Sequence, residues 1–167
     1  MVIQIDSREK AHAIQKILAE FDKKGVKHYV SKLYVGDYMS LDNPRVVIDR
    51  KQNLGEVAGN VCQEHKRFTD ELKRAEEAGI KVIILVEHSY DIKCLEDVVW
   101  WNNPRLKTSP KAIDGVRLYK IMKTIRDKYH CEWQFCSKQQ TGKRILELLN
   151  NDKARNIGKS DDEASSD

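Results

Sequence analysis

The sequence lacks several features that mark common protein classes. No apolar run is long enough to span a membrane, since the most apolar segment, residues 82–86, has only the length of a strand. Met1 is followed at once by a strand pattern, so we expect no signal peptide. There is no G-x-S-x-G turn, phosphate-binding loop or dinucleotide fingerprint. These absences argue against serine-triad, ATP-driven and NAD-driven activities.

The cysteines and histidines form no complete metal-binding pattern. Of the four cysteines, only Cys131 and Cys136 are close together, and the adjacent His130 makes them resemble half of a zinc site. No second pair supplies the remaining ligands, so we expect reduced thiols in the core or in strands. Reduced thiols are typical of an intracellular protein, and we expect a cytoplasmic one.

The 167 residues carry a formal net charge of +4, which is unevenly distributed. Residues 159–167 contain one lysine against four acids, so the rest of the chain is more basic than the total suggests. A basic body suits a polyanionic partner such as DNA. We expect one folded domain over residues 1–151 and a polar, acidic, disordered tail over residues 152–167.

Strand and helix patterns alternate along the chain, which predicts an α/β fold. Ser7 is expected to cap a helix that runs to about Lys24, because apolar residues follow it at helical spacing. Further helices are expected over 64–78, 116–129 and 141–149, and strands over 2–6, 26–33, 80–87 and 131–136. With a hairpin over residues 34–49, this order predicts a three-layer α/β/α sandwich with a mixed central sheet.

The stretch 34–51, YVGDYMSLDNPRVVIDRK, is the most informative part of the sequence. We expect a β-hairpin with its turn at residues 42–45. Side chains alternate across a strand, so Asp49 and Lys51 share one face and Arg50 takes the other. Asp37 joins the first face only if the loop length or a bulge sets that register. Gly36 fits a bulge or a close backbone approach.

Two carboxylates beside an ammonium group suit the hydrolysis of a phosphodiester. Mg²⁺ takes one or two carboxylates together with water and substrate phosphate. A lysine in the same place orients or activates the attacking water and offsets charge at phosphorus. The alternative is a solvated Asp-Lys pair on a surface hairpin, which contributes little. Spacing alone leaves both interpretations open.

Three ordered motifs, IDSRE, VGDY and VVIDRK, resemble those of the XPF-type (ERCC4-like) nuclease domain of the PD-(D/E)XK superfamily. A weaker likeness continues through KRFTDEL, KVIILVE and TGKRILELL, so that it covers about Val2 to Leu149. The resemblance implies a restriction-endonuclease-like fold. It also implies a Mg²⁺- or Mn²⁺-dependent endonuclease that cuts branched or junction DNA during replication, recombination or repair.

The resemblance assigns roles to individual residues. Asp37 and Asp49 are the expected metal ligands, with Asp6 as a third candidate, and Lys51 is expected to act on the water or on phosphorus. Glu9 is expected beside them. Arg50 faces away from Asp49 and Lys51 by strand alternation, so we expect it to brace the site or to hold a backbone phosphate. Arg8 and Arg67 are candidate DNA contacts.

The family's larger members carry helix-hairpin-helix domains, for which this chain has no room. DNA binding and dimerisation are therefore expected to come from this domain, which would form a homodimer, or from a partner subunit. The small size suggests a bacteriophage or prokaryotic form.

Two positions depart from the family pattern. Asp49 stands where the family usually has Glu, and Gly55 stands where its final acid falls, followed by Glu56. Whether Glu56 substitutes stays open. A nuclease-like DNA-binding module without activity is therefore one alternative, and a restriction-type endonuclease that cuts plain duplex is another.

The long irregular segment 88–113 contains Trp100, Trp101 and Arg105 among further bases. Aromatic residues among bases stack on unpaired nucleotides in many single-strand-binding proteins. The alternative is that one tryptophan fills the core while the bases face solvent. Gly55 and Gly59, in a weak helical pattern, would also allow a phosphate backbone to approach closely.

Overall fold

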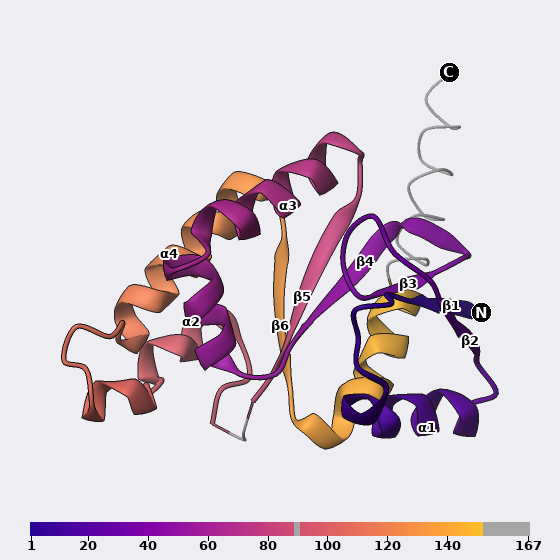
Figure 1. Cartoon of the computed structure of the whole chain (residues 1–167), viewed down its shortest axis with the longest axis horizontal. Coiled ribbons are helices and arrows are strands. Elements are labelled where there is room, and N and C mark those ends of the chain that lie inside the picture. The colour runs from indigo at the N-terminus through magenta and orange to yellow at the C-terminus, as the bar shows by residue number, and fades with distance from the viewer. Residues whose placement is uncertain (89–90, 152–167) are drawn as a thin grey trace. The chain divides into compact units, whose positions relative to one another are not determined.

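The computed structural model describes residues 1–88 and 91–151, so the tail predicted over 152–167 lies outside the described residues. The chain forms two compact units (Figure 1). The first comprises Met1–Ile48 and residues 139–151, and the second comprises Asp49–Lys138. The strands follow the order β2-β1-β3-β4-β5-β6 in a six-stranded sheet. Strand β4 (Asn43–Lys51) passes from the first unit into the second.

The first unit is built on mixed strand pairing. Strand β1 (Val2–Ile5) lies parallel to β2 (Lys27–Val30) and antiparallel to β3 (Tyr38–Ser40), which pairs with β4. Helix α1 (Gln15–Lys23) lies beside the helical residues 141–151. The core is apolar, and its fully or almost fully buried members include Ile3, Ile5, Ile17, Phe21, Tyr38 and Ile145.

The second unit joins parallel strands to three helices. Strands β5 (Lys81–Glu87) and β6 (Glu132–Cys136) are parallel. Helix α3 (His65–Glu77) contacts β5, α2 (Leu54–Cys62) and α4 (Gly115–Tyr129). Two short 3-10 helices, η2 (Leu95–Trp100) and η3 (Pro104–Lys107), interrupt the segment that the sequence leaves irregular.

The structure confirms the predicted α/β class with a mixed sheet, but it corrects two local predictions. The hairpin turn lies at residues 41–42 and not over 42–45, because β4 already begins at Asn43. No helix begins at Ser7, because a 3-10 turn covers Ala11–Ala13 and α1 begins only at Gln15. Residues 7–9 form a turn and a bend instead, in which the carboxylate of Asp6 accepts from the Arg8 amide. Over residues 1–88 and 91–151, no helix combines the length and the hydropathy needed to cross a membrane.

Gly36 shows the close backbone approach that the sequence predicts. Its φ angle is +77°, and a Cβ atom there would lie 2.9 Å from Cβ of Val47. A register shift between Met39 and Ser40 supplies the predicted irregularity in the β3–β4 pair. The short β3 is therefore preceded by a turn that only glycine fits well.

Candidate active site

A buried Asp-Lys pair lies at the end of β4, within the second unit. Lys51 Nζ is 3.4 Å from Asp49 Oδ1, and only 13% and 11% of the two side chains are exposed. The same ammonium group lies 5.5 Å from the ring centroid of Phe68. Lysine is almost never buried unless it is paired, and an aromatic face attracts it. The pair is therefore not the solvated surface pair that the sequence leaves open.

Arg50 lies on the other side of the same strand, as alternation predicts. Its Nη1 donates to Oε1 of Glu87 at 3.0 Å, and both side chains are almost fully buried. This contact fits the bracing role expected of Arg50. Glu87 is a residue that sequence reasoning missed. The available signal is an acid that ends the apolar strand β5, where an unpaired charge would be costly.

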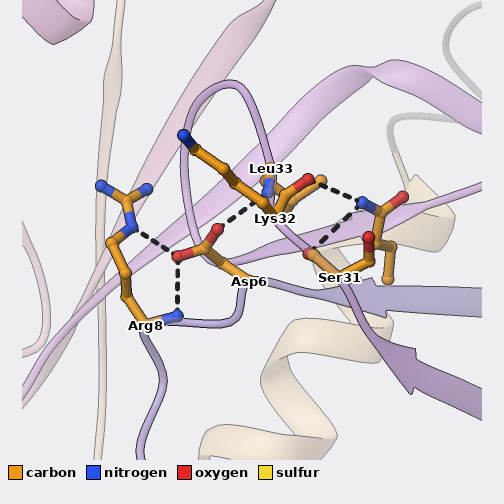
Figure 2. A network of polar contacts seen from close by, with 6 residues as sticks. Asp6, Arg8, Ser31, Lys32 and Leu33 are labelled. Atoms are coloured by element: carbon orange, nitrogen blue, oxygen red, sulfur yellow. Dashed lines mark hydrogen bonds and ion pairs between the residues drawn. The ribbon is translucent and has the colours of Figure 1, made fainter.

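Asp6 is fully buried in the first unit and organises the segment around it (Figure 2). Its Oδ1 accepts from the Leu33 amide at 2.8 Å, and its Oδ2 accepts from Nε of Arg8 at 2.6 Å and from the Arg8 amide at 3.1 Å. Burial by itself would raise the pKa of this carboxyl, but the hydrogen bonds from Leu33 and Arg8 outweigh it and lower the pKa. The group is thus held as a carboxylate that anchors two chain segments.

The backbones of Asp6 and Asp37 are brought together in the first unit. The Asp6 amide donates to the carbonyl of Asp37 at 2.8 Å, and the Asp37 amide donates to the carbonyl of Ile48 at 2.8 Å. Glu9 lies in the same unit, where its Oε2 accepts from the hydroxyl of Tyr38 at 3.0 Å. Three of the acids expected at the site, Asp6, Glu9 and Asp37, therefore belong to one unit, and Asp49 belongs to the other.

The candidate DNA contacts of the second unit separate into exposed and buried residues. Arg67 and Arg105 are exposed. The tryptophans differ sharply, because Trp100 is 80% exposed whereas Trp101 is 8% exposed. Trp101 therefore fills the core, and Trp100 alone of the two has a free ring face.

Glu56, the acid next to Gly55, takes part in capping α2. Its amide donates to Oδ1 of Asn53 at 2.8 Å, and its Oε2 accepts from the Gln52 amide at 2.7 Å. This reciprocal arrangement is a capping box, which stabilises the start of the helix. The carboxylate of Glu56 is thus engaged at the helix end.

The chemistry of the donors limits the kind of metal site. Across residues 1–88 and 91–151, no group of three or more His, Cys, Asp or Glu side chains is placed to hold a metal ion. A hard cation such as Mg²⁺ does not need such a cage, because it binds through one or two carboxylates plus water and substrate phosphate. Aspartate oxygens suit that cation, so the residues present fit it.

Comparison with known proteins agrees with these features. The model of the ERCC4 domain matches residues 5–146. XPF from Aeropyrum pernix is 20% identical, with a TM-score of 0.65, and the match covers 96% of this chain and 69% of that one. XPF from Aeropyrum pernix in complex with DNA is 19% identical, with a TM-score of 0.62, covering 92% and 66%. No curated protein shows significant sequence similarity.

The structural matches show that the fold is that of XPF, a restriction-endonuclease-like fold, as the sequence predicts. The family model spans most of the chain, including the segments that carry Asp6, Asp37 and the Asp49–Lys51 pair. The chain belongs to the ERCC4 domain family, the nuclease family that its motifs resemble.

Proposed function

We propose that the chain is a divalent-metal-dependent DNA endonuclease that acts on branched DNA. Membership of the ERCC4 domain family indicates a DNA nuclease. The observation that carries the proposal is the largely buried pair of Asp49 and Lys51, because lysine is rarely buried and this one is held against a carboxylate and an aromatic ring. The pair stands in the motif that resembles the catalytic motif of the family.

Asp49 and Asp37 are the proposed metal ligands, with Mg²⁺ or Mn²⁺ as the cation. Tyr38 and Ile48 are partners in the β3–β4 strand pair. Asp37 precedes Tyr38 in the chain and Asp49 follows Ile48, so each aspartate is the chain neighbour of one of these two partners. This adjacency supports a shared role for the two carboxylates. When bound, the cation would polarise the phosphodiester and lower the pKa of an attacking water.

The chain's own groups would position and stabilise the substrate. Lys51 would hold the attacking water or offset the charge that develops on phosphorus, because its three N–H donors are fixed in a mostly buried place. Arg50 would act indirectly, since its pairing with Glu87 holds the strand that carries Asp49 and Lys51. Arg8, whose side chain is 57% exposed, is the proposed phosphate contact of the first unit.

DNA as the substrate is supported by the basic body of the chain and by a relative solved in complex with DNA. Asp6 holds the segment before Glu9 in place and is a third candidate ligand.

An inactive DNA-binding module is the second candidate function. It is favoured by Gly55 in place of the family acid and by the engagement of Glu56 in the helix cap.

The test is cleavage of labelled forks, flaps, four-way junctions and plain duplex in Mg²⁺ or Mn²⁺. We expect the wild type to cut branched forms, and Asp49→Asn or Lys51→Met to lower the rate by about 100-fold or more, as loss of a group acting on the transition state does. Asp49→Glu, which restores the usual family residue, should stay active. Lys66→Met, which removes an exposed lysine, is the matched control.

The other outcomes favour the alternatives. Binding of branched DNA without cleavage in either metal supports the inactive module. Cuts at fixed positions in linear duplex support a restriction-type enzyme. Unchanged cleavage in Asp49→Asn would contradict the assignment of this residue.

A further inference from the structure

The second unit contains a pocket that is separate from the Asp49–Lys51 pair. Its volume is about 270 Å³, and it lies between α2 and the segment around η3. Its wall is formed on one side by small residues of α2 such as Gly55 and Gly59. On the other side it is formed by residues that include Asn103, Arg105 and Lys111.

The charge of this pocket has one sign. Arg105 and Lys111 line it, and no aspartate or glutamate is among its lining residues. Both side chains are exposed, and no ion pair within residues 1–88 and 91–151 engages either of them. Two cations without a neutralising acid raise the local concentration of anions, and guanidinium and ammonium groups both bind phosphate.

Asn103 gives the cationic wall a fixed support. Its side chain is buried, its Oδ1 accepts from the Arg105 amide at 3.0 Å, and its Nδ2 donates to the carbonyl of Ile113 at 2.9 Å. One side chain thus ties together the two ends of the segment that carries both cations. A preformed wall binds a ligand without the entropy cost of ordering a loop.

The opposite wall allows close approach of a ligand backbone. Gly59 lies in the middle of α2, where glycine costs about 1 kcal/mol relative to alanine. A Cβ atom there would have no neighbour within 4 Å, so helix packing does not require a glycine. The missing side chain instead leaves space in the pocket.

We propose that this pocket binds a backbone phosphate of a single-stranded DNA segment, with Arg105 and Lys111 as its cationic contacts. The choice of DNA rests on the proposed function. The volume is below that of common small-molecule pockets, which begin at about 300 Å³, so it suits a phosphate group of a longer chain rather than a whole small molecule. Gly55, Arg105 and Lys111 are exposed, so a strand can enter and leave along the surface. Positive grooves that follow a backbone are how single strands are bound without sequence preference.

The test is binding of a fluorescein-labelled oligothymidylate to the full chain in EDTA, followed by anisotropy. Gly59→Leu should fill the pocket without changing the charge and should weaken binding, while helix propensity improves. The double variant Arg105→Ala/Lys111→Ala should bind about tenfold more weakly or worse, because two charge-assisted phosphate contacts are lost. Its slope of log affinity against log salt should fall by about 0.7, the value for one phosphate of a single strand.

The matched control is Lys107→Ala/Lys123→Ala, which removes two exposed lysines that do not line the pocket. It should bind more tightly than the Arg105/Lys111 variant at equal charge. In a Cys94→Ser background, oligonucleotide should also slow maleimide labelling of Cys62, an exposed thiol that lines the pocket. Circular dichroism and thermal unfolding of each variant separate lost binding from lost folding.

Equal binding by Gly59→Leu and wild type would overturn the proposal, as would equal losses in the two double variants. If the pocket variants lose more affinity for duplex DNA than for single-stranded DNA, the choice of ligand is overturned. Because EDTA removes the metal, a wild type that cuts no DNA but whose binding depends on the pocket fails only the proposed function. A wild type that cuts branched DNA but shows no pocket-dependent binding fails only the present inference.

Discussion

The guanidinium of Arg50 and the carboxylate of Glu87 form a buried ion pair, with Nη1 and Oε1 3.0 Å apart and 6% and 5% of the side chains exposed. Moving two charges out of water is costly, and their attraction offsets that cost only when the geometry is good. The pair is therefore poor evidence of extra stability. Removing one partner of a buried pair is, in contrast, strongly destabilising.

Glu87→Ala should lower the free energy of unfolding by about 3–5 kcal/mol, because it removes the carboxylate that faces the buried Arg50 guanidinium. Urea denaturation followed by circular dichroism measures the change. Arg50→Met/Glu87→Leu should recover most of the loss, since it removes both charges and keeps apolar volume. Asp70→Asn, which breaks the exposed pair with Lys66, is the control and should change stability far less. A small effect of Glu87→Ala would mean that water reaches the guanidinium.

The lowered pKa of Asp6 predicts a specific pH dependence of stability. The folded protein holds this carboxyl below its ordinary pKa of 3.8, so the ionised form stabilises the fold. The contribution is complete above the unfolded pKa and is lost as the pH falls through the folded pKa. Asp6→Asn lacks it. The difference in unfolding free energy between wild type and Asp6→Asn should therefore be largest near neutral pH and should shrink below about pH 4.

Urea titrations from neutral to acidic pH measure this difference. Asp114→Asn provides a control. Asp114 also has a lowered pKa, but it caps α4 at the surface through the Arg117 amide, so its effect on the free energy of unfolding should change less with pH. A gap between wild type and Asp6→Asn that widens in acid would contradict the assigned direction of the pKa shift.

Elements with strong periodicity were predictable from the sequence, and elements set by one polar side chain were not. The stripe of apolar residues in α3 predicts that helix almost to the residue. The same reasoning places a helix at Ser7, where the chain instead forms a turn in which the Asp6 carboxylate accepts from the Arg8 amide. Helix propensity carries no information about the hydrogen bond from the Leu33 amide to Asp6, because the two residues lie far apart in the sequence.

The candidate site divides in the same way. Strand alternation predicts that Asp49 and Lys51 share a face and that Arg50 does not, and the contacts agree. The partner of Arg50 was missed, because the acid at the end of β5 is opposed to it only after the strands assemble. The role of Asp37 in binding metal stays a prediction. So do the roles of Glu9, Arg8 and Arg67.

Gly36 should tolerate no side chain. Its φ of +77° disfavours other residues, and a Cβ atom would lie 2.9 Å from Cβ and Cγ2 of Val47. Gly36→Ala should therefore lower the free energy of unfolding by about 2–4 kcal/mol, through backbone strain and overpacking together. Gly59→Ala is the matched control, because its Cβ meets nothing within 4 Å in a helix, and it should stabilise by about 0.5–1 kcal/mol. Thermal unfolding of both variants tests the contrast, and a stable Gly36→Ala would show that β3 and β4 separate easily.

The two adjacent tryptophans should respond to substitution in opposite ways. Trp100 is 80% exposed and Trp101 is 8% exposed, so only Trp100 offers a ring face to an unpaired base. Trp100→Ala should leave stability nearly unchanged and weaken binding of single-stranded DNA by about 1–3 kcal/mol, the usual value of one stacked base. Trp101→Ala should instead destabilise by about 3–5 kcal/mol, because it opens a cavity in the core. Tryptophan fluorescence gives an independent measurement, since oligothymidylate should quench the wild type more than Trp100→Ala. Equal quenching in the two proteins would assign the base contact to another residue.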